Sequence, residues 1–468
     1  MQGRWFHRIA AAAALFTLTC IGGSDCRAQG ASQRAAAHNA PRAYPGRRAT
    51  FERPATVEQR PSALMRVSAG WKDALEGASA LLRPGNGGGQ TALEFWATER
   101  EGLGPADGTK GPLAAPADLS TQRDALGRKF SVAHWNGGDE GLAELRRIPR
   151  LRWLELGLTN VTDVGLEQLA GLNELEVLKL QQTRIGDAGL LSLLKLPGLT
   201  ALTLHDTRVT AEGMNALARL SDLRYLNVSW TTIGNEGLAR LSALPHLEVL
   251  HASDAGLTDE GLAALSSLRE LQNLRLGYNA ISDAGLGALA SLKELNELQI
   301  EQTDLSDAGM AQLARLPRLA GLKISDTQVT DAGVEILCRM PLLDRLDLTN
   351  LRVTDAGAAR LATCRRLAWL VLDGTDVTDE SMEYLARAPQ LMALSLRGTR
   401  ISDAGVRQIA RMPRLSRLSL KETEITDAAL GELANVRHLA VLDLRGTHTT
   451  PEAVGRLASA RPEMEIMR

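Results

Sequence analysis

The stretch LMALSLRGTRISDAGVRQIARMPR, residues 391–414, is one copy of a 24-residue unit that recurs without insertion or deletion. Repetition at a fixed period predicts a fold in which one supersecondary unit is stacked many times. The core should be aliphatic, because hydrophobic residues make up 44% of the chain and aromatic residues only 3%. The thirteen regular copies begin at Leu151, Leu175, Leu199, Leu223, Leu247, Leu271, Leu295, Leu319, Leu343, Leu367, Leu391, Leu415 and Leu439.

Positions within a copy are counted from its opening leucine. Positions 1 and 4 are leucine in every regular copy, and position 6 is Leu, Ile or Val except at Ala252. Positions 4 and 6 therefore have the alternation of a short strand with one inward face. Positions 16, 19 and 20 are apolar, which is the spacing of a helix with one buried stripe. Each copy is predicted to be strand, turn, short helix and return.

A polar motif precedes each predicted helix. Positions 12 and 13 are mostly Thr-Asp or Ser-Asp, as in Ser402-Asp403, and position 15 is mostly glycine, as in Gly405. The hydroxyl or carboxylate should accept the free amide groups at the helix start. Glycine should let the helix start lie close to its neighbour. Capping accounts for the stacked aspartates, and no carboxylate pairs stand at calcium-ligand spacing, so no metal site is predicted.

These residues resemble the leucine-rich repeat family, whose core pattern is L-x-x-L-x-L-x-x-N-x-L. The copies are most similar to 24-residue repeats of the ribonuclease-inhibitor-like and GALA type and to those of exported bacterial proteins. The resemblance implies an α/β fold, a curved solenoid with a parallel sheet on its concave face and short helices on its convex face. Position 9 departs from the family asparagine, since it is threonine in ten copies, and only Asn279 keeps the family residue. A threonine hydroxyl should still bond backbone groups between turns, in a weakened ladder.

The N-terminus predicts export. Arg4, His7 and Arg8 precede an apolar run at residues 9–18 that is too short to span a bilayer. Small residues at Cys26 and Ala28 favour cleavage before Gln29. Residues 1–28 are therefore predicted to be a signal peptide. The mature chain, with no predicted membrane span, should be secreted or lie in the periplasm or cell envelope.

Two further segments follow. Residues 29–126 are rich in Ala, Arg, Gly and Pro, with six arginines against two glutamates in 29–62. They are predicted to be a largely disordered tether with one short helix at 64–82. A degenerate copy with Phe130 and Val132 then opens a solenoid of about fourteen repeats, residues 127–468.

Cleavage after Ala28 would leave Cys338 and Cys364 as the cysteines of the mature chain. They stand at positions 20 and 22 of adjacent copies. The favoured interpretation is two small buried apolar residues. A bridge is the alternative, because it requires closely matched Cβ atoms.

Positions 2, 3, 5, 7 and 8 should face outward on the sheet. Folding does not need aromatic residues there, and aromatic residues with arginine are the usual anchors of protein interfaces. Strand spacing of about 4.8 Å should bring Tyr225, Trp230 and Tyr278 within about 10–15 Å of one another. The alternative is that these are scattered surface aromatics without a role. The predicted partner-binding residues are Trp153, Tyr225, Trp230, His251, Arg275, Tyr278 and Trp369.

Charge on the same positions argues against nucleic acid as the partner. The whole chain has a net charge of −2, and binding of nucleic acid would need a continuous basic stripe. Between residues 247 and 374, the bases at these outward-facing positions are Arg275, Lys323 and Arg345. Eight acids outnumber them: Glu248, Asp254, Glu297, Glu301, Asp326, Asp344, Asp347 and Asp373. A solvated surface of mixed charge is the favoured interpretation.

The sequence contains no Ser-His-Asp arrangement, no H-E-x-x-H segment and no Gly-Lys-Ser/Thr phosphate loop. It therefore predicts no catalytic residues, no metal and no cofactor. The favoured function is a non-catalytic scaffold that binds a protein, a peptide or an envelope polymer. One alternative, by analogy of fold, is a ubiquitin-ligase adaptor or effector of the GALA or F-box type. The other is a purely structural envelope protein.

Overall fold

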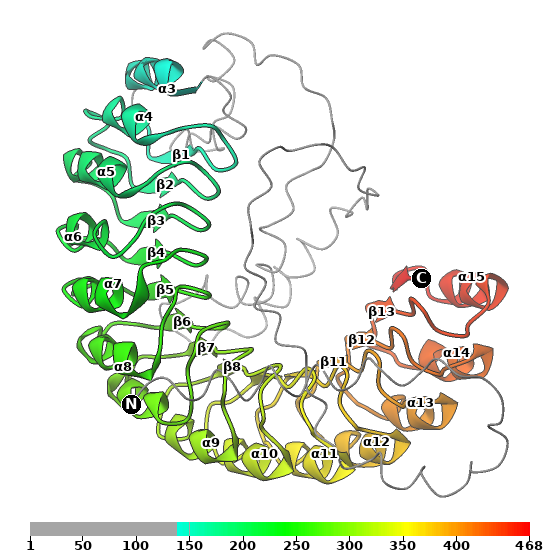
Figure 1. Cartoon of the computed structure of the whole chain (residues 1–468). Helices are drawn as coiled ribbons and strands as arrows, with labels where there is room; N and C mark the ends of the chain where they lie inside the picture. Colours follow the sequence, from blue (N-terminus) through cyan, green and yellow to red (C-terminus); the bar gives the residue numbers. More distant parts are fainter. Residues whose placement is uncertain (1–137, 149) are drawn as a thin grey trace, which may run out of the picture. The chain divides into compact units, whose positions relative to one another are not determined.

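The computed structural model describes residues 138–148 and 150–468, which belong to one compact unit. The predicted signal peptide, tether and helix at 64–82 lie outside the described residues, as do residues 127–137 of the solenoid. The described chain forms one open parallel sheet of fourteen strands in chain order (Figure 1). Each strand pairs with the strand 24 residues later, as Leu154 pairs with Leu178. The predicted solenoid fold is confirmed.

The strands cover positions 3 to 5 of each copy. The last strand, β14, follows the thirteenth regular copy. The repeated leucines do not predict this strand, because they end with that copy. The strands are β1 (Trp153–Glu155), β2 (Val177–Lys179), β3 (Ala201–Thr203), β4 (Tyr225–Asn227), β5 (Val249–His251), β6 (Asn273–Arg275), β7 (Glu297–Gln299), β8 (Gly321–Lys323), β9 (Arg345–Asp347), β10 (Trp369–Val371), β11 (Ala393–Ser395), β12 (Arg417–Ser419), β13 (Val441–Asp443) and β14 (Glu465–Met467).

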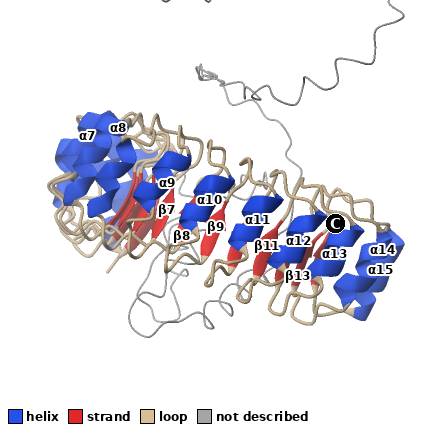
Figure 2. Cartoon of the chain, turned by 90° about the horizontal axis from the view of Figure 1, so that it is seen from below, coloured by secondary structure: helices blue, strands red, loops and turns tan. Residues whose placement is uncertain are grey.

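Helices cover one face of the sheet in every copy (Figure 2). The other sheet face is called the concave face below. The α-helices are α3 (Gly138–Gly141), α4 (Asp163–Glu167), α5 (Asp187–Leu190), α6 (Met214–Leu217), α7 (Gly234–Leu241), α8 (Asp259–Leu262), α9 (Asp307–Leu313), α10 (Asp331–Leu337), α11 (Asp355–Leu361), α12 (Asp379–Leu385), α13 (Asp403–Ile409), α14 (Asp427–Ala434) and α15 (Pro451–Ala460). The 3-10 helices are η3 (Leu142–Arg147), η4 (Leu191–Lys195), η5 (Ala263–Ser267) and η6 (Gly285–Ser291).

The core is the continuous aliphatic layer between the sheet and the helices. Leu154, Leu156 and Leu169 are fully buried, and so are their equivalents along the array. Because each copy contributes only part of this layer, a copy is stable only between its neighbours.

The aspartates at position 13 differ from the prediction. The hydroxyl at position 12 does cap its own helix, as Thr330 accepts a hydrogen bond from the Ala332 amide. The carboxylate instead joins consecutive copies. Asp307 accepts the Thr330 amide at 2.7 Å and the Thr330 hydroxyl at 2.6 Å, both in the next copy. A Cβ on Gly333 would lie 2.5 Å from this carboxylate, which is why position 15 is glycine.

The threonines at position 9 also act differently from the prediction. The Thr183 hydroxyl donates to the Leu180 carbonyl at 2.7 Å, within its own turn. Asn279 alone spans two copies. Its Oδ1 accepts the amides of Ala255 and Leu257, and its Nδ2 donates to the Ala252 carbonyl. A hydroxyl is too short to reach the neighbouring turn, whereas the longer amide side chain reaches it.

Cys338 and Cys364 form a disulfide, with their Cα atoms 5.0 Å apart. The favoured interpretation of two unpaired apolar residues was therefore wrong. Cys338 is the C-cap residue of α10, whereas Cys364 follows α11 in the next copy, and adjacent copies lie side by side. The bridge fastens the helix sides of these two copies to each other.

Candidate functional site

The structure brings four of the seven predicted residues together, with His205 beside them. Trp230 and Tyr278 have ring centroids 6.2 Å apart, and His205 meets the edge of Trp230 at 6.4 Å. Tyr225 packs edge-on against His251 at 5.3 Å, and its hydroxyl lies 3.3 Å from the His251 Nδ1. We call these five residues the aromatic cluster: His205, Tyr225, Trp230, His251 and Tyr278. It spans the copies that begin at Leu199, Leu223, Leu247 and Leu271.

Trp230 and Tyr278 both stand at position 8, three residues after the last residue of the strand. Their φ angles are +59° and +61°, and the corresponding residue has positive φ in every regular copy. A hydrogen bond to the next copy holds this left-handed turn, as the Trp230 amide donates to the Ser253 carbonyl at 2.8 Å. Glycine fits this backbone without strain, and Gly374 and Gly398 occupy it elsewhere. Large aromatic residues there are therefore not required by the fold.

His251 does not face solvent as the sequence predicted. It is only 2% exposed, whereas Trp230 and Tyr278 are 51% and 45% exposed. Burial, and then the positive charge of Arg275, hold the pKa of His251 well below its usual value. A histidine with a lowered pKa is neutral at neutral pH, so His251 supports the Tyr225 ring rather than contributing charge.

Of the other three predicted residues, Arg275 borders the aromatic cluster, whereas the two tryptophans lie apart from it. Arg275 lies half-buried on β6, next to His251 on β5. Trp153 lies on β1 under the ammonium of Lys179, 5.0 Å from its ring centroid. Trp369 lies on β10, where the Arg417 guanidinium is 6.0 Å from its ring centroid. The seven residues therefore do not form one continuous surface.

A shallow groove of about 480 Å³ opens beside Trp230. Its floor is backbone, because Gly234 and Gly256 have no side chains and adopt φ angles of +59° and +73°. Position 13 of the preceding copy is Ala211, so no aspartate carboxylate is present there to accept the Gly234 amide. This amide instead donates forward to the Ala255 carbonyl at 2.9 Å. The lining residues are Trp230, Thr231, Thr232, Gly234, Asp254, Ala255 and Gly256.

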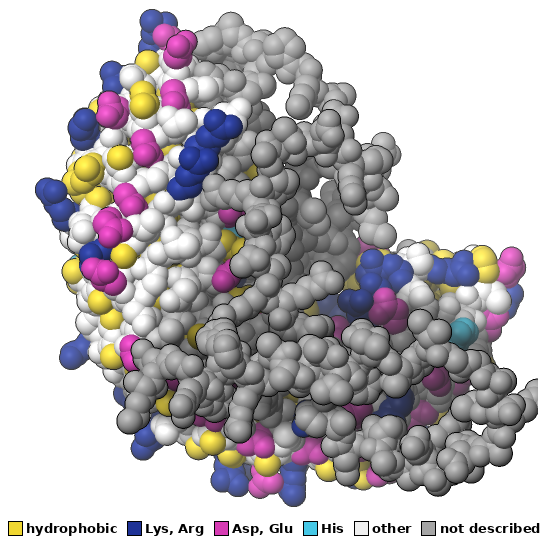
Figure 3. Space-filling model, viewed as in Figure 1, with side chains coloured by type: hydrophobic (Ala, Val, Ile, Leu, Met, Phe, Trp, Pro, Cys, Tyr) yellow, Lys and Arg dark blue, Asp and Glu magenta, His cyan; other side chains and the backbone are white. Residues whose placement is uncertain are grey.

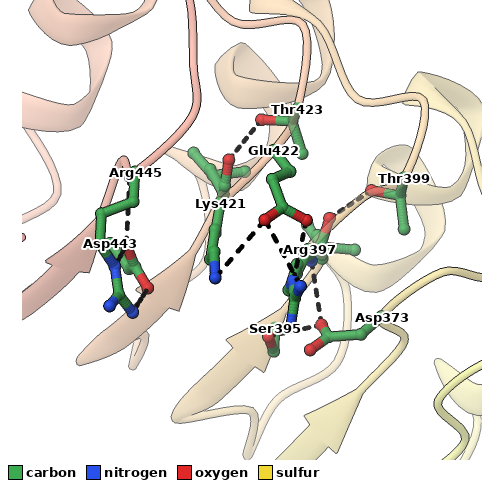
Figure 4. A network of polar contacts seen from close by, with 11 residues as sticks. Asp373, Ser395, Arg397, Thr399, Lys421, Glu422, Thr423, Asp443 and Arg445 are labelled. Carbon is green, nitrogen blue, oxygen red and sulfur yellow. Dashed lines mark hydrogen bonds and ion pairs between the residues drawn. The ribbon is translucent and has the colours of Figure 1, made fainter. Parts of the chain in front are cut away.

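Many charged side chains of the concave face pair with one another, and some of the pairs remain exposed to solvent. Arg345 on β9 reaches across Gly321 to the buried Glu297 on β7 at 2.9 Å. Further along, Arg397 and Lys421 both pair with Glu422, and Arg445 pairs with Asp443 (Figure 4). Opposite charges thus hold one another in position along the sheet.

On the edge of the solenoid that Figure 3 shows, basic and acidic side chains are interspersed. None of the helices in residues 138–468 has the length and apolar character needed to cross a bilayer. Within the same residues, no group of three or more His, Cys, Asp or Glu side chains could hold a metal ion.

A family model and one solved structure agree with this architecture. A family model described as a leucine-rich repeat region matches residues 136–356 and 186–451. Among solved structures, an internalin from Listeria monocytogenes is similar with a TM-score of 0.52 and 22% sequence identity, over 70% of this chain and 93% of the internalin. The plant peptide hormone receptor RGFR1, solved in complex with RGF2, has a TM-score of 0.34 and 16% identity, over 70% and 64% of the two chains.

No curated protein matches the chain in sequence. The family model alone covers more than half of the chain, and its span coincides with the 24-residue copies and the parallel sheet. The chain belongs to the leucine-rich repeat family.

Proposed function

We propose that this protein is a non-catalytic scaffold that binds a protein or peptide through the aromatic cluster. Trp230 and Tyr278 are the proposed anchors, while Tyr225, His251 and Arg275 support them from the strands. Trp153 and Trp369 are proposed as outlying contacts for a partner that extends along the sheet.

One observation carries the proposal. Trp230 and Tyr278 are exposed aromatic side chains on a left-handed backbone, a conformation that costs a non-glycine residue about 1 kcal/mol or more. Neither side chain contributes to the aliphatic core. Retaining two such residues so that their rings meet at 6.2 Å favours a binding role over a structural one.

Replacing both Trp230 and Tyr278 by glycine should strongly weaken partner binding without loss of stability. Losing two anchors should weaken binding by at least about 2 kcal/mol. Relief of left-handed strain should offset the about 0.4–1 kcal/mol of chain entropy that each glycine adds to the unfolded state. The measurement pairs partner capture from an envelope extract by the full mature chain with thermal unfolding.

Leu158→Gly is the matched control. Leu158 is 59% exposed, has a φ angle of +63° and stands at position 8 of a copy outside the aromatic cluster. This control should keep the partner. Unchanged capture by the Trp230→Gly, Tyr278→Gly double variant would reject the binding site and favour a purely structural role.

We also propose that the protein is exported. The N-terminal pattern at residues 1–28 supports this, and so does the disulfide, because structural disulfides persist mainly in oxidising compartments. N-terminal sequencing of the protein from its own cells should find a chain that begins at Gln29. A cytoplasmic chain that begins at Met1 would contradict export.

A further inference from the structure

Asp254 differs from the other acids that the sequence places on this side of the sheet. Seven of the eight have a polar or charged partner, for example Glu248 with Arg224 and Asp326 with Asn350. The Asp254 carboxylate accepts no hydrogen bond and forms no ion pair with any residue in the described part of the chain. Its backbone amide alone is bonded, to the Gly277 carbonyl.

Asp254 stands between the two exposed aromatic residues. All three occupy position 8, with Trp230 one copy before Asp254 and Tyr278 one copy after it. Backbones two strands apart are separated by about 9.6 Å, yet the two ring centroids are 6.2 Å apart. The rings therefore lean toward each other over the copy that carries Asp254.

The groove beside Trp230 has the chemistry of a cation site. Asp254 is its only charged lining residue, Thr231 and Thr232 add hydroxyl groups, and Trp230 adds a ring face. Partial burial raises the pKa of Asp254, and no neighbouring base acts to lower it. Asp254 is exposed to solvent at the groove, so its carboxylate is accessible to a bound cation.

We propose that this groove binds a single arginine side chain of the protein partner, with its guanidinium paired to Asp254 and stacked on Trp230, the aromatic residue that lines the groove. The proposal rests on the function assigned to the aromatic cluster and names the chemistry that the cluster recognises. Arginine is favoured over lysine, because a planar guanidinium stacks on aromatic rings and can donate two hydrogen bonds to one carboxylate.

The test is a titration of the full mature chain with the peptide acetyl-Gly-Arg-Gly-amide. Binding is followed by the indole N–H resonance of Trp230, which is assigned by its loss in Trp230→Phe. The substitution Asp254→Asn should weaken the affinity for the peptide by about tenfold, because a charge-assisted contact is lost. The same peptide with citrulline in place of arginine should bind the parent chain with an affinity lowered to a similar extent. Citrulline keeps the shape of the arginine side chain but not its positive charge.

Asp326→Asn is the matched control, since Asp326 also occupies position 8 with positive φ. It should leave peptide binding unchanged. Equal affinities for the arginine and citrulline peptides, or an Asp254→Asn variant that binds as tightly as the parent, would overturn the cation site. If the Trp230→Gly, Tyr278→Gly double variant still loses the natural partner in that case, the function assigned to the aromatic cluster stands without it. If this variant keeps the partner, that function fails as well.

Discussion

Replacing Cys338 and Cys364 together by alanine is expected to lower the free energy of unfolding by about 3 kcal/mol. The bridge joins residues 26 apart, and closing a loop of this length restricts the unfolded chain. The bridge also joins two copies in the middle of an array whose members otherwise contact only their neighbours. Without it, the array should open at this point first. Denaturant unfolding of the oxidised protein, the reduced protein and the double variant measures the effect.

The fold offers a matched test of the same geometry. Ala362 and Ala388 occupy positions 20 and 22 of the next pair of copies, so cysteines introduced there should form a second bridge. Peptide mapping without reductant should link residues 324–339 to residues 361–365 in the natural chain. A denaturation midpoint that does not move on reduction, or the absence of the linked peptide, would show that the bridge does not form.

The period of 24 predicted most of the fold because it reports burial directly. A leucine that returns at positions 1 and 4 of every copy can only be a repeated core residue, and Leu154 and Leu178 are fully buried and paired in register. The hydrogen-bonding roles were less predictable. Asp307 and Thr183 are chemically able to bond within a copy or between copies, and only the distance between turns decides which.

The left-handed turn at position 8 was missed, although the sequence contains a signal for it. Glycine, asparagine or aspartate fills that position in seven regular copies, including Gly374, Asn350 and Asp206, and these residues tolerate positive φ. Trp230 and Tyr278 obscure the pattern. The sequence nevertheless predicts both residues as binding residues. An aromatic residue that faces solvent is not needed for folding, whatever its backbone conformation.

Replacing Asn279 by alanine is expected to lower the free energy of unfolding by about 3 kcal/mol, because buried backbone groups lose their partners. The Ala255 and Leu257 amides would lose an acceptor, and the Ala252 carbonyl would lose a donor. Hydrogen exchange at the two amides should accelerate more than elsewhere in the array. Partner binding should weaken too, because Ala255 lines the groove beside Trp230.

Other residues at position 9 provide the controls. Thr303→Ala removes one hydrogen bond, to the Ile300 carbonyl within the same turn, and should cost about 1 kcal/mol. Asn279→Thr cannot reach the neighbouring copy and should remain destabilised. Adding Ala255→Thr to it should restore part of the loss, because a hydroxyl at residue 255 can bond the Ala252 carbonyl as Thr183 bonds Leu180. If Asn279→Ala costs no more than Thr303→Ala, then Asn279 does not hold the two copies together, and the groove needs no support from the next turn.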